Sequence, residues 1–285
     1  MTGIHVETFI GANDTQLVGD VGGDPDAPPV ILLHGGGQTR HSWRQTMQSM
    51  IADRYRVISL DARGHGDSQW SKDGAYSLDL FAEDLRSVLR TLPRKPALVG
   101  ASLGGLTSLV MLGEDPEAAC ALVLVDIVPR SNTSGVERIQ AFMRRHLDGF
   151  DSLQEVSAAV RQYNPQRQDG NDLGLMKNLR VRDDGRLYWH WDPRFISRIG
   201  EVDIAEAQAR LDDAASRIKI PTLLVRGMRS DITSDDGVSH FKALMPHLEV
   251  CNIADASHMV AGDENDVFAG AVMGFLMRHN TGLPP

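Results

Sequence analysis

The sequence predicts an α/β fold with a mostly parallel central sheet, flanking helices and a mainly helical insertion. Three observations predict it. Short apolar runs alternate with longer helical patterns. The runs are continuously apolar, as in strands buried on both faces. The alternation stops between Pro129 and about Ala215, where the pattern is helical or irregular, and it resumes at Ile220.

The elements follow in chain order. Residues 4–10 and 16–21 are predicted to pair as antiparallel strands around a turn at 12–14. Buried strands are predicted at 30–33, 57–60, 97–99, 122–125, 222–225 and 250–253, and helices at 78–92, 103–112, 241–245 and 266–278. We therefore expect a core formed by residues 1–129 and 216–285, with residues 130–215 inserted as a helical cap.

Composition excludes several classes of protein. The 285 residues are 42% hydrophobic and 24% charged, as in ordinary globular domains and unlike disordered or collagen-like chains. A net charge of −9 argues against nucleic-acid binding. Cys120 and Cys251 provide no disulfide framework. Because neither a signal-peptide pattern nor a membrane-spanning apolar run occurs, we expect a cytoplasmic protein without a membrane partner.

The strongest motif is Gly100-Ala101-Ser102-Leu103-Gly104, between the predicted strand at 97–99 and the helix at 103–112. A Gly-x-Ser-x-Gly turn in this context is a nucleophile elbow, which exposes the serine at the carboxyl edge of the sheet. The alternative is a structural glycine-rich turn. We predict that Ser102 is a nucleophile.

A second motif, His34-Gly35-Gly36-Gly37, directly follows the strand at 30–33. Acyl transfer needs two N–H donors aimed at the developing oxyanion. We predict that the backbone N–H groups of Gly36 and Leu103 form this oxyanion hole, and that His34 orients the loop. A dinucleotide-binding loop does not fit, because no Gly-x-Gly-x-x-Gly pattern leads into a helix.

The loop 61–68 has the sequence Asp-Ala-Arg-Gly-His-Gly-Asp-Ser after the strand at 57–60. Its glycines and charged residues predict a loop fixed by hydrogen bonds. His65 resembles a catalytic base, but it precedes Ser102, whereas this type of elbow is followed by the acid and then the base.

His258, after the strand at 250–253, is the predicted base. Two carboxylates are candidates for the acid: Asp231, in the loop after the strand at 222–225, and Asp126, at the end of the strand at 122–125. Both are expected at the same sheet edge as Ser102. Asp231 is preferred, because its loop and that of His258 both lie in the second half of the core.

The predicted cap contains Trp189 and Trp191, two of the four tryptophans. This stretch either roofs the substrate pocket or packs as the core of the cap. The cap also has twelve arginines among its 13 basic residues, against 14 acidic residues. An anionic substrate would account for the arginines, but pairing at the surface is the favoured account.

Together these motifs resemble the α/β-hydrolase family, in its cap-bearing esterase and peroxidase-like branch. The resemblance spans the His34 loop, the loop 61–68, the Ser102 elbow, Asp231 and His258. It implies an α/β-hydrolase fold and a serine hydrolase. Epoxide hydrolases and haloalkane dehalogenases also resemble the chain, but they need an aspartate where Ser102 stands.

The predicted function is hydrolysis of a carboxylic ester, or a close acyl relative, through an acyl-enzyme on Ser102. The alternatives are a lactone or carbon–carbon bond hydrolase with the same triad and a non-catalytic ligand receptor. We expect a small-molecule acyl substrate as the partner. No cofactor and no metal are expected, because the sequence shows neither a P-loop nor metal-ligand spacing.

Overall fold

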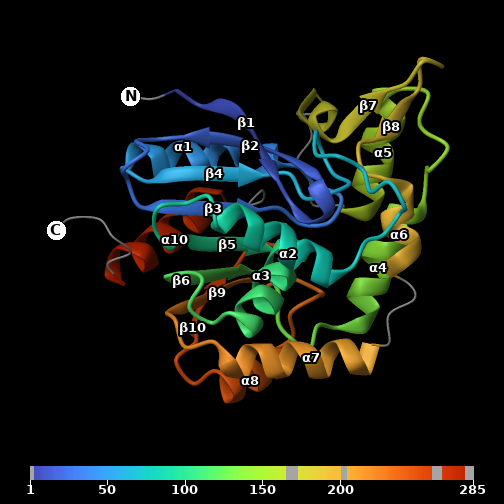
Figure 1. Ribbon diagram of the computed structural model, residues 1–285. Coiled ribbons are helices and arrows are strands. Elements are labelled where there is room, and N and C mark those ends of the chain that lie inside the picture. The colour runs from blue at the N-terminus through green and yellow to red at the C-terminus, as the bar shows by residue number, and fades with distance from the viewer. Residues whose placement is uncertain (1–2, 165–172, 200–203, 259–264, 280–285) are drawn as a thin grey trace.

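The computed structural model describes residues 3–164, 173–199, 204–258 and 265–279. Within them, an eight-stranded sheet has the order β1-β2-β4-β3-β5-β6-β9-β10 (Figure 1). Strand β2 pairs antiparallel with β1 and β4, and the remaining neighbours are parallel. The strands are β1 (His5–Ile10), β2 (Gln16–Gly22), β3 (Pro29–Leu33), β4 (Arg56–Leu60), β5 (Ala97–Ala101), β6 (Ala121–Val125), β9 (Thr222–Gly227) and β10 (Glu249–Ile253). The predicted fold class is confirmed.

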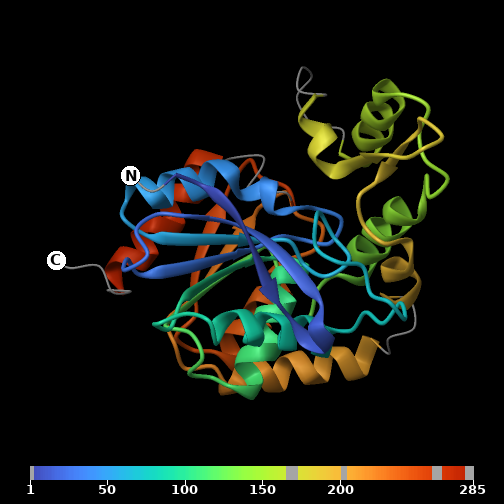
Figure 2. The same cartoon turned by 45° about the horizontal axis from the view of Figure 1, so that its top comes forward.

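Helices cover both faces of the sheet, in three layers (Figure 2). One face carries α2 (Leu78–Leu89), α3 (Leu103–Glu114), α7 (Ile204–Arg217) and α8 (Asp235–Leu244), whereas the other carries α1 (Arg44–Ala52) and α10 (Asn265–Arg278). Short 3-10 helices lie at η1 (Ala12–Asp14) and η2 (Arg40–Trp43).

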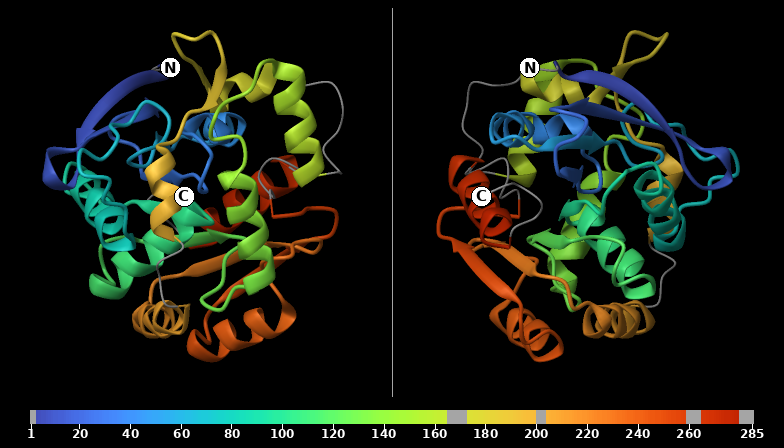
Figure 3. Two further views of the ribbon diagram at one scale, coloured as in Figure 1. Left: turned by 90° about the vertical axis from the view of Figure 1, so that its right-hand side faces the viewer. Right: turned by 60° about the vertical axis from the view of Figure 1, so that its left-hand side comes forward.

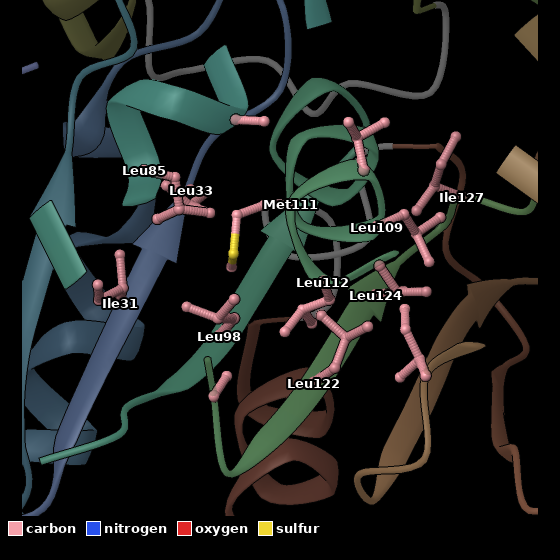
Figure 4. Packing of buried hydrophobic residues seen from close by; sticks show 14 of the residues in the cluster. Ile31, Leu33, Leu85, Leu98, Leu109, Met111, Leu112, Leu122, Leu124 and Ile127 are labelled. Atoms are coloured by element: carbon pink, nitrogen blue, oxygen red, sulfur yellow. The ribbon is translucent and has the colours of Figure 1, made fainter. Parts of the chain in front are cut away.

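Alternate residues of one strand belong to different cores, which explains the continuous apolar runs. In β3, Ile31 and Leu33 pack with α2 and α3 (Figure 4), whereas Val30 and Leu32 pack with α1 and α10. Successive side chains of a strand point to opposite faces, so a strand covered on both sides needs apolar residues at every position. This double burial makes the sheet a rigid platform for the loops at its carboxyl edge.

The segment between β6 and β9 lies largely beside the carboxyl ends of the parallel strands (Figures 1 and 3). Its described elements are α4 (Thr133–Arg144), α5 (Leu153–Tyr163), η3 (Leu173–Asn178), β7 (Leu179–Val181), β8 (Leu187–Trp189), α6 (Pro193–Ile199) and α7. Strands β7 and β8 form an antiparallel hairpin. The sequence did not predict this hairpin, because three-residue strands leave too little pattern.

The predicted cap boundary at residue 216 falls within α7, which packs along α3 of the core. A methyl group on Gly113 would lie 2.5 Å from Cβ of Ala214, so the two helices are in close contact. The elements that stand over the sheet edge therefore end before α7. The division into core and cap domains itself remains a prediction.

The boundaries of other helices also differ from the predictions. Helix α8 begins at Asp235, earlier than the predicted 241–245, because Ser234 caps it by accepting a hydrogen bond from the N–H of Gly237. Helix α2 ends at Leu89 rather than at 92. No helix in the described part of the chain combines the length and the apolarity that crossing a bilayer requires.

Candidate active site

Ser102 occupies a strained turn between β5 and α3. Its φ of 45° and ψ of −110° are rare for a residue with a side chain. The glycines around it permit the turn: a Cβ on Gly100 would lie 2.5 Å from the carbonyl oxygen of Gly104, and one on Gly104 would lie 2.4 Å from that of Leu33. Larger residues would open the turn. The predicted strand–turn–helix context of Ser102 is confirmed.

The imidazole of His258 pairs with Asp126. Nδ1 of His258 lies 2.8 Å from Oδ2 of Asp126. The carboxylate is fully buried and the histidine side chain is 12% exposed. A carboxylate on Nδ1 keeps the proton on that nitrogen and leaves Nε2 as the basic atom, which is the arrangement that a general base requires.

The prediction that Asp231 would be the partner of His258 is wrong. The Asp231 carboxylate forms an ion pair of 2.8 Å with Arg138 of α4 and is one-third exposed. The loop after β9 instead turns Ser230 inward, and its hydroxyl donates to the Asp126 carboxylate. Asp126 directly follows the strand β6, which pairs with β5, the strand that leads into the turn at Ser102. Strand β9 lies between β6 and the strand β10 that precedes His258, so Asp126 and His258 meet across the end of β9, where the N–H of Gly227 also donates to Asp126.

Hydrogen bonds hold Asp126 in place. The N–H of Gly227 donates to Oδ1 at 3.2 Å, and the hydroxyl of Thr233 donates to the same oxygen. The hydroxyl of Ser230 and the imidazole of His258 share Oδ2. Neither Ser230 nor Thr233 was among the site residues predicted from the sequence. The spacing Ser-x-x-Thr after β9 is the only local signal for this pair.

The glycine-rich loop at 34–37 lies against the elbow. A methyl group on Gly35 would lie 3.4 Å from Cβ of Ser102, and the N–H of Gly104 donates to the carbonyl oxygen of His34 at 3.2 Å. Leu103 is the first residue of α3, so its N–H has no carbonyl of the helix to bind. The loop and the helix start therefore lie on either side of the serine, whereas the oxyanion role of Gly36 and Leu103 remains a prediction.

The loop 61–68 is fixed by hydrogen bonds, as the sequence predicted, and they converge on a buried carboxylate. Asp61 is fully buried and accepts the N–H groups of Arg40 at 2.7 Å and Asp67 at 2.9 Å. The guanidinium of Arg40 also pairs with Asp61. Sequence reasoning missed Arg40, which lies in η2, far from this loop in the chain. His65 of the same loop is fully buried and does not contact Asp126.

The aromatic residues of the predicted cap form one cluster. Trp189 and Trp191 are stacked with their ring centroids 4.9 Å apart, and they are 7% and 2% exposed. A methyl group on Gly37 would lie 3.3 Å from Cζ3 of Trp191. Trp189 lies behind it, edge-on to Phe142 and Phe150. Trp191 therefore touches the glycine-rich loop, while Trp189 packs among other aromatic residues of the predicted cap.

Several arginines of the predicted cap pair with carboxylates, as the favoured account expected. Besides Arg138, the pairs include Arg130 with Asp212, Arg186 with Asp151, Arg194 with Asp192, and Arg210 with Asp79 and Glu114. Arg138 also lies 5.5 Å from the ring centre of Tyr163. Among the residues that the structure places, no cluster of three or more His, Cys, Asp or Glu side chains has the geometry of a metal site.

With its doubly covered sheet, strained serine and paired histidine, the molecule has the architecture of a hydrolase. The sequence model of the alpha/beta hydrolase fold matches residues 28–264. The chain belongs to this family, and it is an esterase-like member.

Relatives of the chain support this assignment. It is 32% identical to esterase Rv0045c of Mycobacterium tuberculosis over 262 residues, which cover 88% of this chain and 83% of that protein. It is 27% identical to 3-hydroxybutyrate-oligomer hydrolase of Cupriavidus necator, with 83% and 84% covered. The crystal structure of E-2-(acetamidomethylene)succinate hydrolase superposes with a TM-score of 0.84 at 22% identity, covering 96% of this chain and all of that one. At that identity the superposition shows the fold alone.

Proposed function

We propose that the protein hydrolyses carboxylic esters through an acyl-enzyme on Ser102, with His258 as the base and Asp126 as the acid. The contact between His258 Nδ1 and the buried Asp126 carboxylate carries this proposal. The strained turn at Ser102 and the esterase relative support it.

In this mechanism Nε2 of His258 takes the proton of the Ser102 hydroxyl as the oxygen attacks the ester carbonyl. Asp126 holds the imidazole and stabilises its protonated form. The N–H groups of Gly36 and Leu103 hold the oxyanion, and His258 returns the proton to the leaving alcohol. A water molecule, deprotonated by His258, then attacks the acyl-enzyme and releases the carboxylic acid.

The proposed substrate is a small acyl ester. The proposed location of the enzyme is the cytoplasm. Because one relative is named as a 3-hydroxybutyrate-oligomer hydrolase, short hydroxyacyl esters are among the substrates to be tested. The proposed pocket wall for the acyl or alcohol group of the substrate is formed by Trp191, because its side chain belongs to an apolar cluster and lies beside the glycine-rich loop.

A fluorophosphonate probe tests the proposal directly. Wild-type protein should be labelled at Ser102, as located by peptide mass spectrometry, and should hydrolyse at least one member of a panel of esters, lactones and thioesters. Hydrolysis of lactones alone would favour the alternative bond class. If the correctly folded protein is not labelled and hydrolyses no member of the panel, only the non-catalytic receptor remains as an explanation.

A further inference from the structure

Three consecutive peptide groups of the glycine-rich loop are each held by a buried histidine. His34 Nδ1 lies 2.8 Å from the carbonyl oxygen of Gly35 and donates to it. The N–H of Gly37 donates to Nε2 of His65 at 3.2 Å. The carbonyl oxygen of Gly37 lies 3.4 Å from Nε2 of His190. The three rings come from the loop itself, from the loop 61–68 and from the cap.

The second nitrogen of each ring fixes its tautomer. In each ring one nitrogen accepts a backbone N–H and the other donates to a carbonyl oxygen, so each imidazole is neutral. The remaining partners are the N–H of Ala62 for His34 at 3.0 Å, the carbonyl oxygen of Arg63 for His65 at 3.1 Å, and the N–H of Gly66 for His190 at 2.7 Å.

The rings also form a packed row. The ring centroids of His34 and His65 are 5.2 Å apart, and those of His65 and His190 are 5.8 Å apart. All three residues are at most 2% exposed. Burial lowers the pKa of each of them, that of His65 to about 3. Neutral imidazoles suit such a row, because protonated rings at these distances would repel one another.

A planar peptide group transmits these contacts to the oxyanion hole. Because the peptide bond is planar and trans, a hydrogen bond to the carbonyl oxygen of Gly35 also sets the direction of the Gly36 N–H. The next two peptide groups, held by His65 and His190, anchor the C-terminal side of that N–H. Glycines have no side chains with which to fix these groups themselves.

We propose that His190 is a positioning residue for the oxyanion hole, through which the cap sets the orientation of the glycine-rich loop. The inference rests on the function proposed above. His190 lies between β8 and α6 and joins two loops of the core, by donating to Gly37 and accepting from Gly66. Met143 and Trp191 of the predicted cap also pack on Gly37.

Two variants of His190 separate its two hydrogen bonds. In His190→Gln the amide nitrogen takes the place of Nε2 and retains the donor to Gly37. In His190→Asn the side chain reaches only the position of Nδ1, so the contact with Gly37 is lost. Tyr188→Phe on the same cap hairpin is the matched control, since it removes only the hydrogen bond between Tyr188 and Asp184.

The readout compares an ester with its thionoester, whose sulfur is larger and a weaker acceptor than oxygen. An aligned oxyanion hole favours the oxygen substrate. We expect His190→Asn to lower kcat for the ester about tenfold or more, with KM little changed, because small misplacements of catalytic groups are costly. The ester-to-thionoester rate ratio should fall with it. His190→Gln and Tyr188→Phe should retain the wild-type ratio.

Rates are normalised to the fraction of enzyme labelled by fluorophosphonate. A folded His190→Asn enzyme with the wild-type ratio would overturn the inference while leaving the proposed function intact. If His190→Asn does not fold, His190→Gln decides: a retained ratio supports the inference and a lost ratio overturns it. A wild-type protein that hydrolyses no ester overturns the proposed function, and this inference with it.

Discussion

Nδ1 of His258 lies 2.8 Å from the buried carboxylate of Asp126, although the two residues are 132 positions apart in the chain. Asp126 follows strand β6, next to the strand β5 that leads to Ser102, and His258 follows β10 at the edge of the sheet. Asp231, in the loop after the intervening strand β9, faces Arg138. Asp126 and His258 therefore approach each other from strands on either side of that loop.

This geometry predicts opposite outcomes for two asparagine variants. Asp126→Asn should lower kcat by about three to four orders of magnitude, because the amide no longer favours the productive tautomer of His258 or stabilises its protonated form. Asp231→Asn should retain nearly all activity and lose at most about 1 kcal/mol of stability, the value of an exposed ion pair. Ester hydrolysis and urea unfolding measure the two effects. The reverse ranking of the two variants would restore Asp231 as the acid.

Ser102→Ala should abolish turnover and leave the fold intact. The side chain of Ser102 stands at a turn formed by close glycine contacts, so little packing depends on its hydroxyl. Loss of a triad nucleophile typically costs about 10⁴-fold or more in kcat. Ester hydrolysis and circular dichroism are compared with the control Ser49→Ala, which changes an exposed serine of α1. Residual activity above about a hundredth of wild type would contradict the assignment of the nucleophile.

Stability should fall as the pH drops below about 6.5, the pKa of histidine in an unfolded chain. Burial, above all, lowers the pKa of His34, His65 and His190 in the folded protein. The unfolded chain therefore binds more protons than the folded protein below this pH, and the stabilisation present above it is progressively lost. Each histidine contributes up to about 1.4 kcal/mol per pH unit.

Urea midpoints measured between neutrality and moderately acidic pH test this dependence. His190→Gln removes one of the three titrating groups and should make the decline shallower. His247→Gln, which changes an exposed histidine, should leave the decline as in wild type. A midpoint that stays constant through this range would show that the row of histidines does not resist protonation.

The sequence predicted the inner strands of the core well because they are buried on both faces and therefore continuously apolar, as β3 and β6 illustrate. Ser102 and His258 were recognisable because short motifs adjoin those strands. The pairing of His258 with Asp126 rather than Asp231 could not be recognised from the sequence. It depends on the turn of the loop after β9, which points Ser230 inward and Asp231 outward. The contacts of His190 join segments more than a hundred residues apart, so no local sequence pattern could predict them.

The two stacked tryptophans of the predicted cap should differ in their effect on substrate preference. Trp191 packs on Gly37 and lies 5.4 Å, ring to ring, from His190, whereas Trp189 is enclosed by Phe142 and Phe150. Replacement of either by alanine removes a large buried side chain and should cost about 3–5 kcal/mol. The gentler pair Trp191→Phe and Trp189→Phe therefore tests function. Trp191→Phe should alter the preference among esters from acetate to octanoate, because it reshapes the surface beside the glycine-rich loop. Trp189→Phe should keep the wild-type preference and lower only the Tm. Unchanged preferences in both folded variants would assign Trp191 to the core of the cap and remove it from the substrate pocket.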